Sequence, residues 1–105
     1  MKITDIEVIP IFPKLAARYA HRVVDLYGIE CRVVYKVTTD NGIVGYGEQR
    51  IRPWAKVDPT SVEHLIGRDP FDFVNNTLGA VGGALYDVMG KYLEVPAYKI
   101  FYLAF

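Results

Sequence analysis

The sequence predicts an α+β fold in which a small β-sheet packs on a layer of helices. Three observations support this prediction. Residues 1–10, 30–40 and 43–49 carry the β-branched and alternating patterns of strands. Two helix-start signals follow in the second half. Near the end, apolar residues recur with helical spacing at Val81, Ala84, Leu85, Val88, Met89, Tyr92 and Leu93. One face of that helix should be buried, and the sheet is the partner that the chain offers.

The composition is that of one folded domain spanning residues 1–105. The chain is 51% hydrophobic and 23% charged, as in globular proteins. Its 12 basic and 12 acidic residues cancel, so we expect no nucleic acid and no anionic membrane among its partners. No apolar run reaches the roughly 18–20 residues of a spanning helix, and no signal peptide is apparent. We therefore expect a cytoplasmic protein.

The first strand, over residues 1–10, should be irregular because Ile3, Ile6, Val8 and Ile9 do not alternate strictly with polar residues. We expect Pro10 and Pro13 to end it, since proline cannot donate to a ladder.

The clearest strand covers residues 30–40, where one face carries Cys31, Val33, Tyr35 and Val37. A turn at Asn41-Gly42 should lead to the partner strand. A two-residue turn would place Gly45 and Gly47 on the opposite face, where missing side chains let another group approach. It would also make three cross-strand pairs: Thr39 with Val44, Val37 with Tyr46, and Tyr35 with Glu48.

Two short helices should precede the long one. The first begins with Asp58 as cap and Pro59 as first helical residue, or with Thr60 as cap, and in both cases it ends at Gly67. Asp69 and Pro70 start the second. The long helix should end near Pro96, because the residue before a proline avoids helical geometry. Residues 97–105 could add one helical turn.

Two loops are candidates for ligand contact. Residues 11–28 have no clean period, which is typical of a functional connection, although a short helix over residues 14–20 is an alternative. Residues 50–54 carry two arginines and the only tryptophan. Such a loop can grip an anion against an aromatic surface, or can be a salt-bridged loop with one anchoring indole.

The residues by themselves indicate no catalytic or metal site. The carboxylates are spread singly, and neither His21 nor His64 has a partner at metal-ligand spacing. Cys31, the single cysteine, is expected to be a small buried hydrophobic residue. We expect His64 to lie on the surface.

Four segments in order resemble the N-terminal capping domain of the enolase superfamily, in its mandelate racemase and muconate lactonizing enzyme group. They are Met1-Lys-Ile-Thr-Asp-Ile-Glu-Val8, Thr39-Asp-Asn-Gly-Ile-Val-Gly-Tyr-Gly-Glu48, Leu65-Ile-Gly-Arg-Asp-Pro-Phe-Asp72, and Ala84-Leu-Tyr-Asp-Val-Met-Gly-Lys91 with Val95-Pro-Ala-Tyr98. The resemblance implies a three-stranded antiparallel β-meander followed by a small helical bundle. The stretch between Asp72 and Ala84 is shorter than in the family, so the second helix should be reduced.

The resemblance also implies a role. In the family this domain covers a catalytic TIM-like barrel, and two loops, matching residues 11–28 and 49–54 here, close over the substrate and help to select it. Family chemistry removes the proton α to a carboxylate, with Mg²⁺ bound by the barrel. A small carboxylate or acid sugar is the implied substrate, gripped by arginine. The implied substrate-facing residues are Tyr19, His21, Arg22, Arg50, Arg52 and Trp54.

The barrel residues cannot be carried over, because the chain stops where the barrel would start, and the family's Lys-x-Lys base motif is absent. We expect either a truncated racemase, cycloisomerase or acid-sugar dehydratase, or a retained capping domain, inactive alone and without a metal site of its own. The alternatives are a stand-alone interaction module that self-associates, and a domain that lends its loops to a separately encoded barrel.

Overall fold

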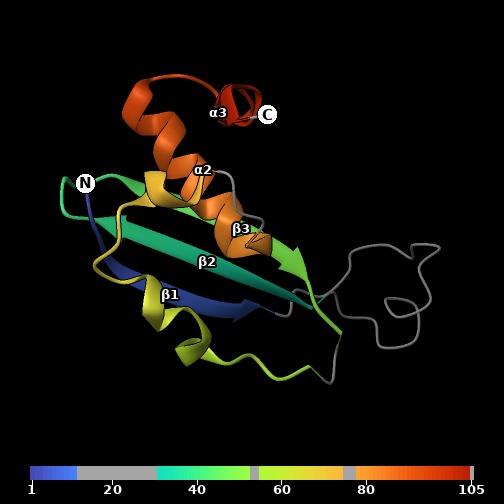
Figure 1. Ribbon diagram of the computed structural model, residues 1–105. Helices are drawn as coiled ribbons and strands as arrows, with labels where there is room; N and C mark the ends of the chain where they lie inside the picture. The colour runs from blue at the N-terminus through green and yellow to red at the C-terminus, as the bar shows by residue number, and fades with distance from the viewer. Residues whose placement is uncertain (12–30, 53–54, 75–77, 105) are drawn as a thin grey trace.

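The computed structural model describes residues 1–11, 31–52, 55–74 and 78–104. Three strands form an antiparallel sheet in the order β1-β2-β3, and helices follow (Figure 1). This confirms the predicted α+β fold. The elements are β1 (Ile3–Ile11), β2 (Arg32–Thr39), β3 (Val44–Arg50), the 3-10 helices η1 (Pro59–Leu65) and η2 (Pro70–Phe73), and the α-helices α2 (Gly79–Leu93) and α3 (Ala97–Ala104).

Strand β1 is irregular, as predicted, with a shift in pairing between Ile3 and Asp5. It continues one residue past Pro10 and ends at Ile11, before Pro13. Pro10 lies opposite Val33. In an antiparallel sheet, successive residues direct their backbone hydrogen bonds alternately to the two neighbouring strands, and Val33 directs its own towards β3. The missing N–H of Pro10 therefore faces the outer edge, where a strand tolerates proline.

The predicted register of the hairpin is wrong by one residue. Thr38 lies opposite Val44, Val37 opposite Gly45, and Tyr35 opposite Gly47. The reason is a loop of three residues, 40–42, instead of two. The N–H of Gly42 donates to the carbonyl of Thr39 at 3.1 Å, and the N–H of Thr39 donates to the carbonyl of Ile43 at 3.0 Å. Gly42 has φ +83, the left-handed residue that a three-residue hairpin loop requires.

This register brings Gly45 and Gly47 to the helix-covered face, so their predicted placement on the other face is also wrong. The group that approaches them is α2. A Cβ at Gly45 would lie 2.5 Å from the carbonyl oxygen of Ala84, and one at Gly47 would lie 2.1 Å from that of Ala80. Glycine at both positions lets the helix backbone rest directly on the strand.

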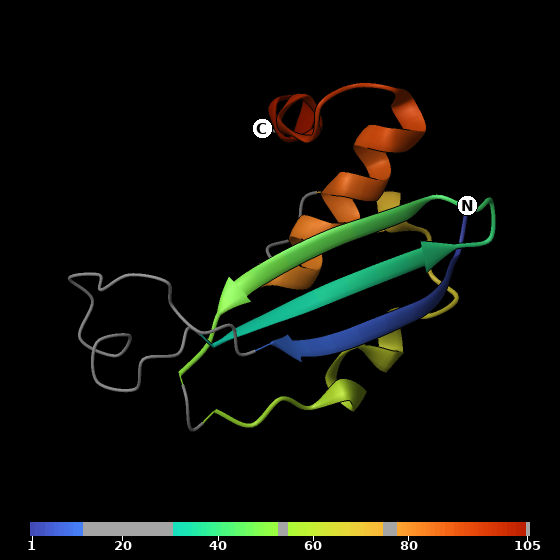
Figure 2. The ribbon, with the colours of Figure 1, turned by 180° about the vertical axis from the view of Figure 1, so that it is seen from behind.

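The core lies between the sheet and a single helical layer. Figures 1 and 2, taken from opposite sides, show α2 and η1 on the same side of the strands. Val33 and Val37 are buried on the predicted inner face of β2, and Cys31, just before the strand, is buried as well. The main hydrophobic cluster takes residues from the strands, the 3-10 helices and the α-helices: Ile3, Val37, Val62, Leu65, Phe73, Val81, Ala84, Leu85, Val88, Met89 and Ile100.

The apolar stripe of α2 is buried only in part. Tyr92 and Leu93 were expected to be buried, yet they are 51% and 45% exposed. The last turn of α2 rises away from the sheet (Figure 1), so no strand lies beneath it. Tyr92 makes an edge-on contact with Phe71 of η2 instead, with ring centroids 5.7 Å apart.

The helix starts follow the aspartates. Asp58, not Thr60, caps η1, because its carboxylate accepts the N–H of Thr60 at 2.9 Å. Asp69 caps η2 in the same way, through the N–H of Phe71 at 2.9 Å. Both are 3-10 helices, the first ending at Leu65 before Gly67, and η2 is reduced to 4 residues.

Helix α2 ends at Leu93, close to the predicted end before Pro96. Glu94 adopts the left-handed conformation at φ 58, and the N–H of Val95 donates to the carbonyl of Gly90 at 2.9 Å. Helix α3 then spans 8 residues, more than the single turn expected. None of the helices within the described ranges has the length and apolar character that crossing a membrane would require.

Candidate functional site

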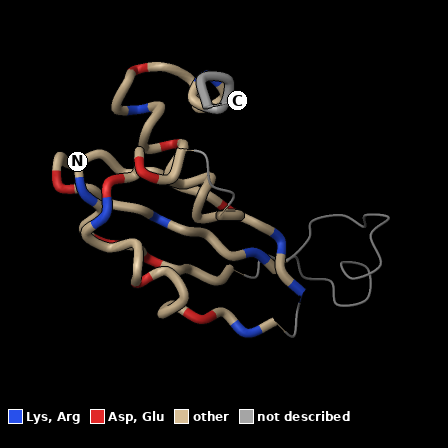
Figure 3. The backbone as a smooth tube through the Cα atoms, in the orientation of Figure 1, with Lys and Arg blue, Asp and Glu red and all other residues tan. Residues whose placement is uncertain are grey.

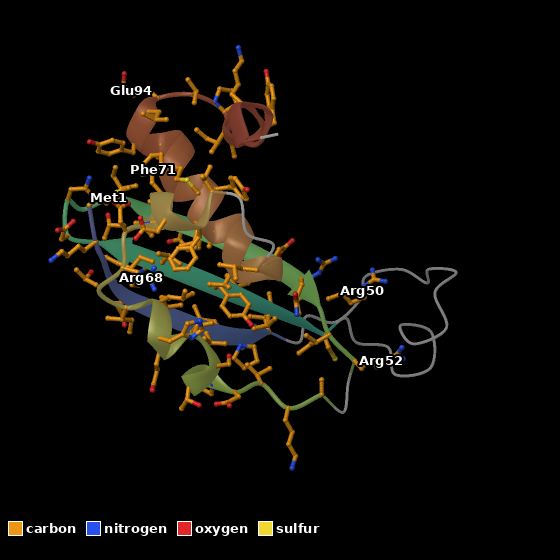
Figure 4. The ribbon with its side chains drawn as sticks, viewed as in Figure 1. Met1, Arg50, Arg52, Arg68, Phe71 and Glu94 are labelled. Atoms are coloured by element: carbon orange, nitrogen blue, oxygen red, sulfur yellow. The ribbon has the colours of Figure 1, made fainter. Side chains whose placement is uncertain are left out.

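One end of the sheet carries the predicted arginines. Ile11 pairs with Arg32, and Arg32 pairs with Arg50, so β1 ends, β2 begins and β3 ends at the same place. Ile11 at the end of β1 and Arg50 at the end of β3 therefore lie at this same end of the sheet. Figure 4 shows Arg50 and Arg52 here, and Figure 3 shows basic residues gathered at this end of β2 and β3. We call Arg32, Glu48, Arg50 and Arg52 the arginine end.

The charges of the arginine end are arranged on one face of the sheet. Arg32 and Arg50 are direct cross-strand partners, so their side chains leave the same face and repel each other. Glu48 lies two residues before Arg50 on that face, and its Oε1 is 3.3 Å from Nη1 of Arg32. The carboxylate offsets one of the two neighbouring guanidinium charges. Among the described residues, this face therefore carries two guanidinium groups and one carboxylate at the end of β2 and β3.

The backbone beyond β3 continues the ladder and then turns. The N–H of Ile51 donates to the carbonyl of Cys31 at 2.9 Å, and the N–H of Ala55 donates to the carbonyl of Arg52 at 2.9 Å. Ile51 is thus held by the residue just before β2, and Arg52 follows it directly. Both Arg50 and Arg52 are exposed. Guanidinium groups in this position can bind a carboxylate with two parallel hydrogen bonds.

The other predicted site residues, Tyr19, His21, Arg22 and Trp54, lie outside the described residues. Arg32 and Glu48 join the site although neither was predicted for it. Their place depends on Arg32 facing Arg50, and the predicted two-residue turn set Arg50 opposite Val33 instead. Counting the hairpin loop as three residues would have revealed this pairing.

Residues 1–11, 31–52, 55–74 and 78–104 contain no group of three His, Cys, Asp or Glu side chains placed to hold a metal ion. The described residues therefore do not fit Mg²⁺. His64 is exposed on η1, as expected, and Cys31 is buried. The described part of the chain offers exposed guanidinium groups that can contact an anion.

The perturbed carboxyl of Asp58 belongs to a helix cap and not to this site. Its pKa is lowered, first because it accepts the hydroxyl of Thr60 and second because it accepts the N–H of the same residue. Hydrogen bonds to the ionised form favour that form.

No family model matches the chain. Among curated proteins, the chain is similar to a D-galactonate dehydratase from Pectobacterium atrosepticum, with 30% identity over 87 residues. The match covers 62% of this chain and 23% of the relative. The chain therefore spans about a quarter of the length of this curated relative.

Three solved structures share the fold. A dipeptide epimerase from Enterococcus faecalis, complexed with Mg and the dipeptide L-Leu-L-Tyr, has TM-score 0.68 and 21% identity, covering 95% of this chain and 34% of that one. An enolase described as a putative sugar isomerase from Streptomyces coelicolor has TM-score 0.65 and 29% identity, covering 89% and 29%. A putative mandelate racemase/muconate lactonizing enzyme from Silicibacter pomeroyi has TM-score 0.65 and 20% identity, covering 95% and 32%.

Proposed function

The chain belongs to the enolase superfamily, and on this premise we propose that it acts as the N-terminal capping domain of a mandelate racemase/muconate lactonizing enzyme-like protein. In this role it covers the active site and helps to select the substrate. The arginine end is the observation that carries the proposal. It places Arg50 and Arg52 where the segments after β1 and β3 leave the sheet.

The proposed substrate class is a small carboxylate or an acid sugar. The exposed guanidinium groups of Arg50 and Arg52 support it, because guanidinium groups bind carboxylates with defined geometry. The similarity to a D-galactonate dehydratase supports the acid-sugar member of this class. In the full-length enzyme the reaction removes the proton α to the carboxylate with Mg²⁺ assistance, as in a racemase, cycloisomerase or dehydratase. The proposed role places the metal ligands and the base in the barrel, so we expect no turnover by this chain alone.

The proposed partner is a catalytic barrel. The matched solved structures support it, since the chain covers only 29% to 34% of their lengths. The proposed docking surface consists of exposed apolar side chains at the end of α2 and in α3. They are Tyr92, Leu93 and Tyr98, which are 51%, 45% and 60% exposed. Burying such side chains against a second domain is favourable because it removes apolar area from water.

Proton exchange tests the proposed inactivity. The purified chain is incubated in D₂O with Mg²⁺ and D-galactonate, and exchange of the α-proton is followed by NMR. The expected result is no exchange above the rate without protein. Sustained exchange by the chain alone would contradict the proposal.

A stand-alone module that self-associates is the second candidate, and the same exposed residues favour it. A protein that keeps these apolar side chains uncovered gains by pairing them with a second copy. Light scattering at dilute concentration separates the two candidates. A monomer excludes the module, whereas an oligomer that survives dilution favours it over the capping domain.

A further inference from the structure

The loop between β2 and β3 contains a pair of residues with chemistry of its own. Asn41 is followed by Gly42, and both are exposed at the end of the hairpin. The main-chain nitrogen of the residue after an asparagine can attack the side-chain carboxamide. Glycine hinders this attack least, because it has no side chain. Nothing lies within 4 Å of the place where a Cβ of Gly42 would be, so the surroundings leave room for the reaction.

The closed loop holds these two residues in a geometry that does not react. The N–H of Gly42 donates to the carbonyl of Thr39 at 3.1 Å, the hydrogen bond of a turn that runs from Thr39 to Gly42. In the turn that begins a three-residue hairpin loop, the residue at the position of Asn41 has ψ of about 0°. A five-membered ring needs the Gly42 nitrogen beside the carboxamide of Asn41, and therefore a different ψ. The turn must open before the ring can close.

The hydroxyl of Thr39 links the two ends of the loop. Its Oγ1 lies 2.5 Å from Oδ1 of Asn41 and 2.8 Å from the carbonyl oxygen of Ile43. Thr39 is 3% exposed, so water does not readily replace these contacts. Asp40 is tied to Lys2 by two hydrogen bonds of 2.9 Å, from the N–H of Lys2 to Oδ1 and from its own N–H to the carbonyl of Lys2. Asn41 and Gly42 are therefore the part of the loop that has to move.

We propose that Asn41 is a site of spontaneous modification and that the Thr39 hydroxyl sets its rate by holding the loop closed. When the loop opens, the Gly42 nitrogen loses its proton to solvent and attacks Cγ of Asn41. The new N–Cγ bond closes a succinimide, and the Cγ–Nδ2 bond breaks. The leaving NH₂ group takes a proton from water and departs as ammonia. Water then opens the ring at either carbonyl, which gives aspartate or isoaspartate.

The modification changes the segment that sets the register of the hairpin. Isoaspartate routes the main chain through Cβ and Cγ of residue 41, so the loop gains one backbone atom. The length of this loop places Gly45 and Gly47 beneath α2 and Arg32 opposite Arg50. The isoaspartate form should therefore melt at a lower temperature than the unmodified chain. Either product also adds one negative charge to a chain whose 12 basic and 12 acidic residues cancel.

The proposal is independent of the capping role and is tested on the chain itself. The purified chain is incubated for days at neutral and at alkaline pH. Ion-exchange chromatography follows the added negative charge, and mass spectrometry of peptides locates it. Thr39→Val keeps the shape of the side chain and removes the hydroxyl. The matched control is Thr38→Val, the same change at a residue whose side chain lies on the other face of β2.

Thr39→Val should modify Asn41 about three- to tenfold faster than the wild type and Thr38→Val, because the loop opens more often without the hydrogen bonds of the hydroxyl. The rate should rise with pH, since the Gly42 nitrogen must lose its proton. In concentrated urea all three chains should react at one faster rate. Equal rates for Thr39→Val and wild type in native buffer would overturn the proposal, as would modification at Asn75 or Asn76 but not at Asn41.

A conservative variant separates the hydroxyl from general stability. Thr39→Ser keeps the hydroxyl and loses a buried methyl group, so it lowers the stability of the fold without removing the contacts to the loop. It should react as slowly as the wild type. If Thr39→Ser reacts as fast as Thr39→Val, global destabilisation and not the hydroxyl controls the rate, and the proposal fails.

Discussion

The backbones of Gly47 and Ala80 meet without a side chain between them. A Cβ at Gly47 would lie 2.1 Å from the carbonyl oxygen of Ala80, well inside any normal contact. This contact sets how closely α2 lies on β3, the strand that ends in Arg50. The position of the arginine end relative to the helical layer therefore depends on a glycine.

Replacing Gly47 by alanine should destabilise the fold. The new methyl group meets backbone atoms, which cannot rotate away, so strand and helix must separate. Overpacking of this kind costs roughly 1–3 kcal/mol or more. Urea denaturation measures it. The matched control is Gly83→Ala, where nothing lies within 4 Å, and this variant should gain up to about 1 kcal/mol. Equal stability of both variants would contradict the close contact.

Truncating Leu85 should cost far more than truncating Leu93. Leu85 of α2 is 1% exposed and belongs to the hydrophobic core, whereas Leu93 in the last turn of α2 is 45% exposed. Leu85→Ala should lower the free energy of unfolding by about 2–5 kcal/mol, because it leaves a cavity. Leu93→Ala should lower it by less than about 1 kcal/mol. Similar losses in thermal or urea unfolding would show that the last turn is buried after all.

The sequence predicted the strands and helices better than the register between strands and the packing between elements. Alternation identified the inner face of β2, because a strand with one buried face leaves a period of two. The hairpin register was missed because Asp40-Asn41-Gly42 suits loops of two or three residues equally well, and one residue moves Gly45 and Gly47 to the other face.

Helical spacing likewise identified the stripe of α2 but not its burial. Whether Tyr92 is covered depends on where the sheet ends, and this is a property of the assembled fold. The pairing of Arg32 with Arg50, in contrast, was missed together with the hairpin register, because it follows from the length of the loop.

Stability should depend on pH through Asp58. Because the pKa of Asp58 is lowered in the folded chain, its ionised form contributes stability above the ordinary value of 3.8. That contribution is lost as the pH falls through the lower folded value. The melting temperature of wild type should therefore exceed that of Asp58→Ala at neutral pH, and the difference should shrink in acid.

The partner variant Thr60→Val removes the hydroxyl that contributes most to the shift. It should reproduce part of the same pH dependence. A difference between wild type and Asp58→Ala that is constant down to the acid limit would rule out this cap as its source.

Glu48 should contribute to the stability of the fold through its ion pair with Arg32 and its proximity to Arg50. In Glu48→Gln the guanidinium groups of Arg32 and Arg50 lose the carboxylate beside them. Since Glu48 is 57% exposed, we expect a loss of no more than about 0.5 kcal/mol, larger at low salt than at high salt. A double-mutant cycle with Arg32→Gln measures the coupling. A coupling of zero at low salt would mean that the ion pair does not form in solution.

We propose that this chain caps a catalytic barrel. The direct measurement is Mg²⁺-dependent turnover of D-galactonate by a chimera, in which this chain replaces the N-terminal part of the D-galactonate dehydratase from Pectobacterium atrosepticum. The chimera should turn over substrate faster than the isolated barrel, because a closed site excludes water and completes the substrate contacts. A chimera that unfolds as one cooperative unit and yet is no more active than the barrel alone would contradict the claim.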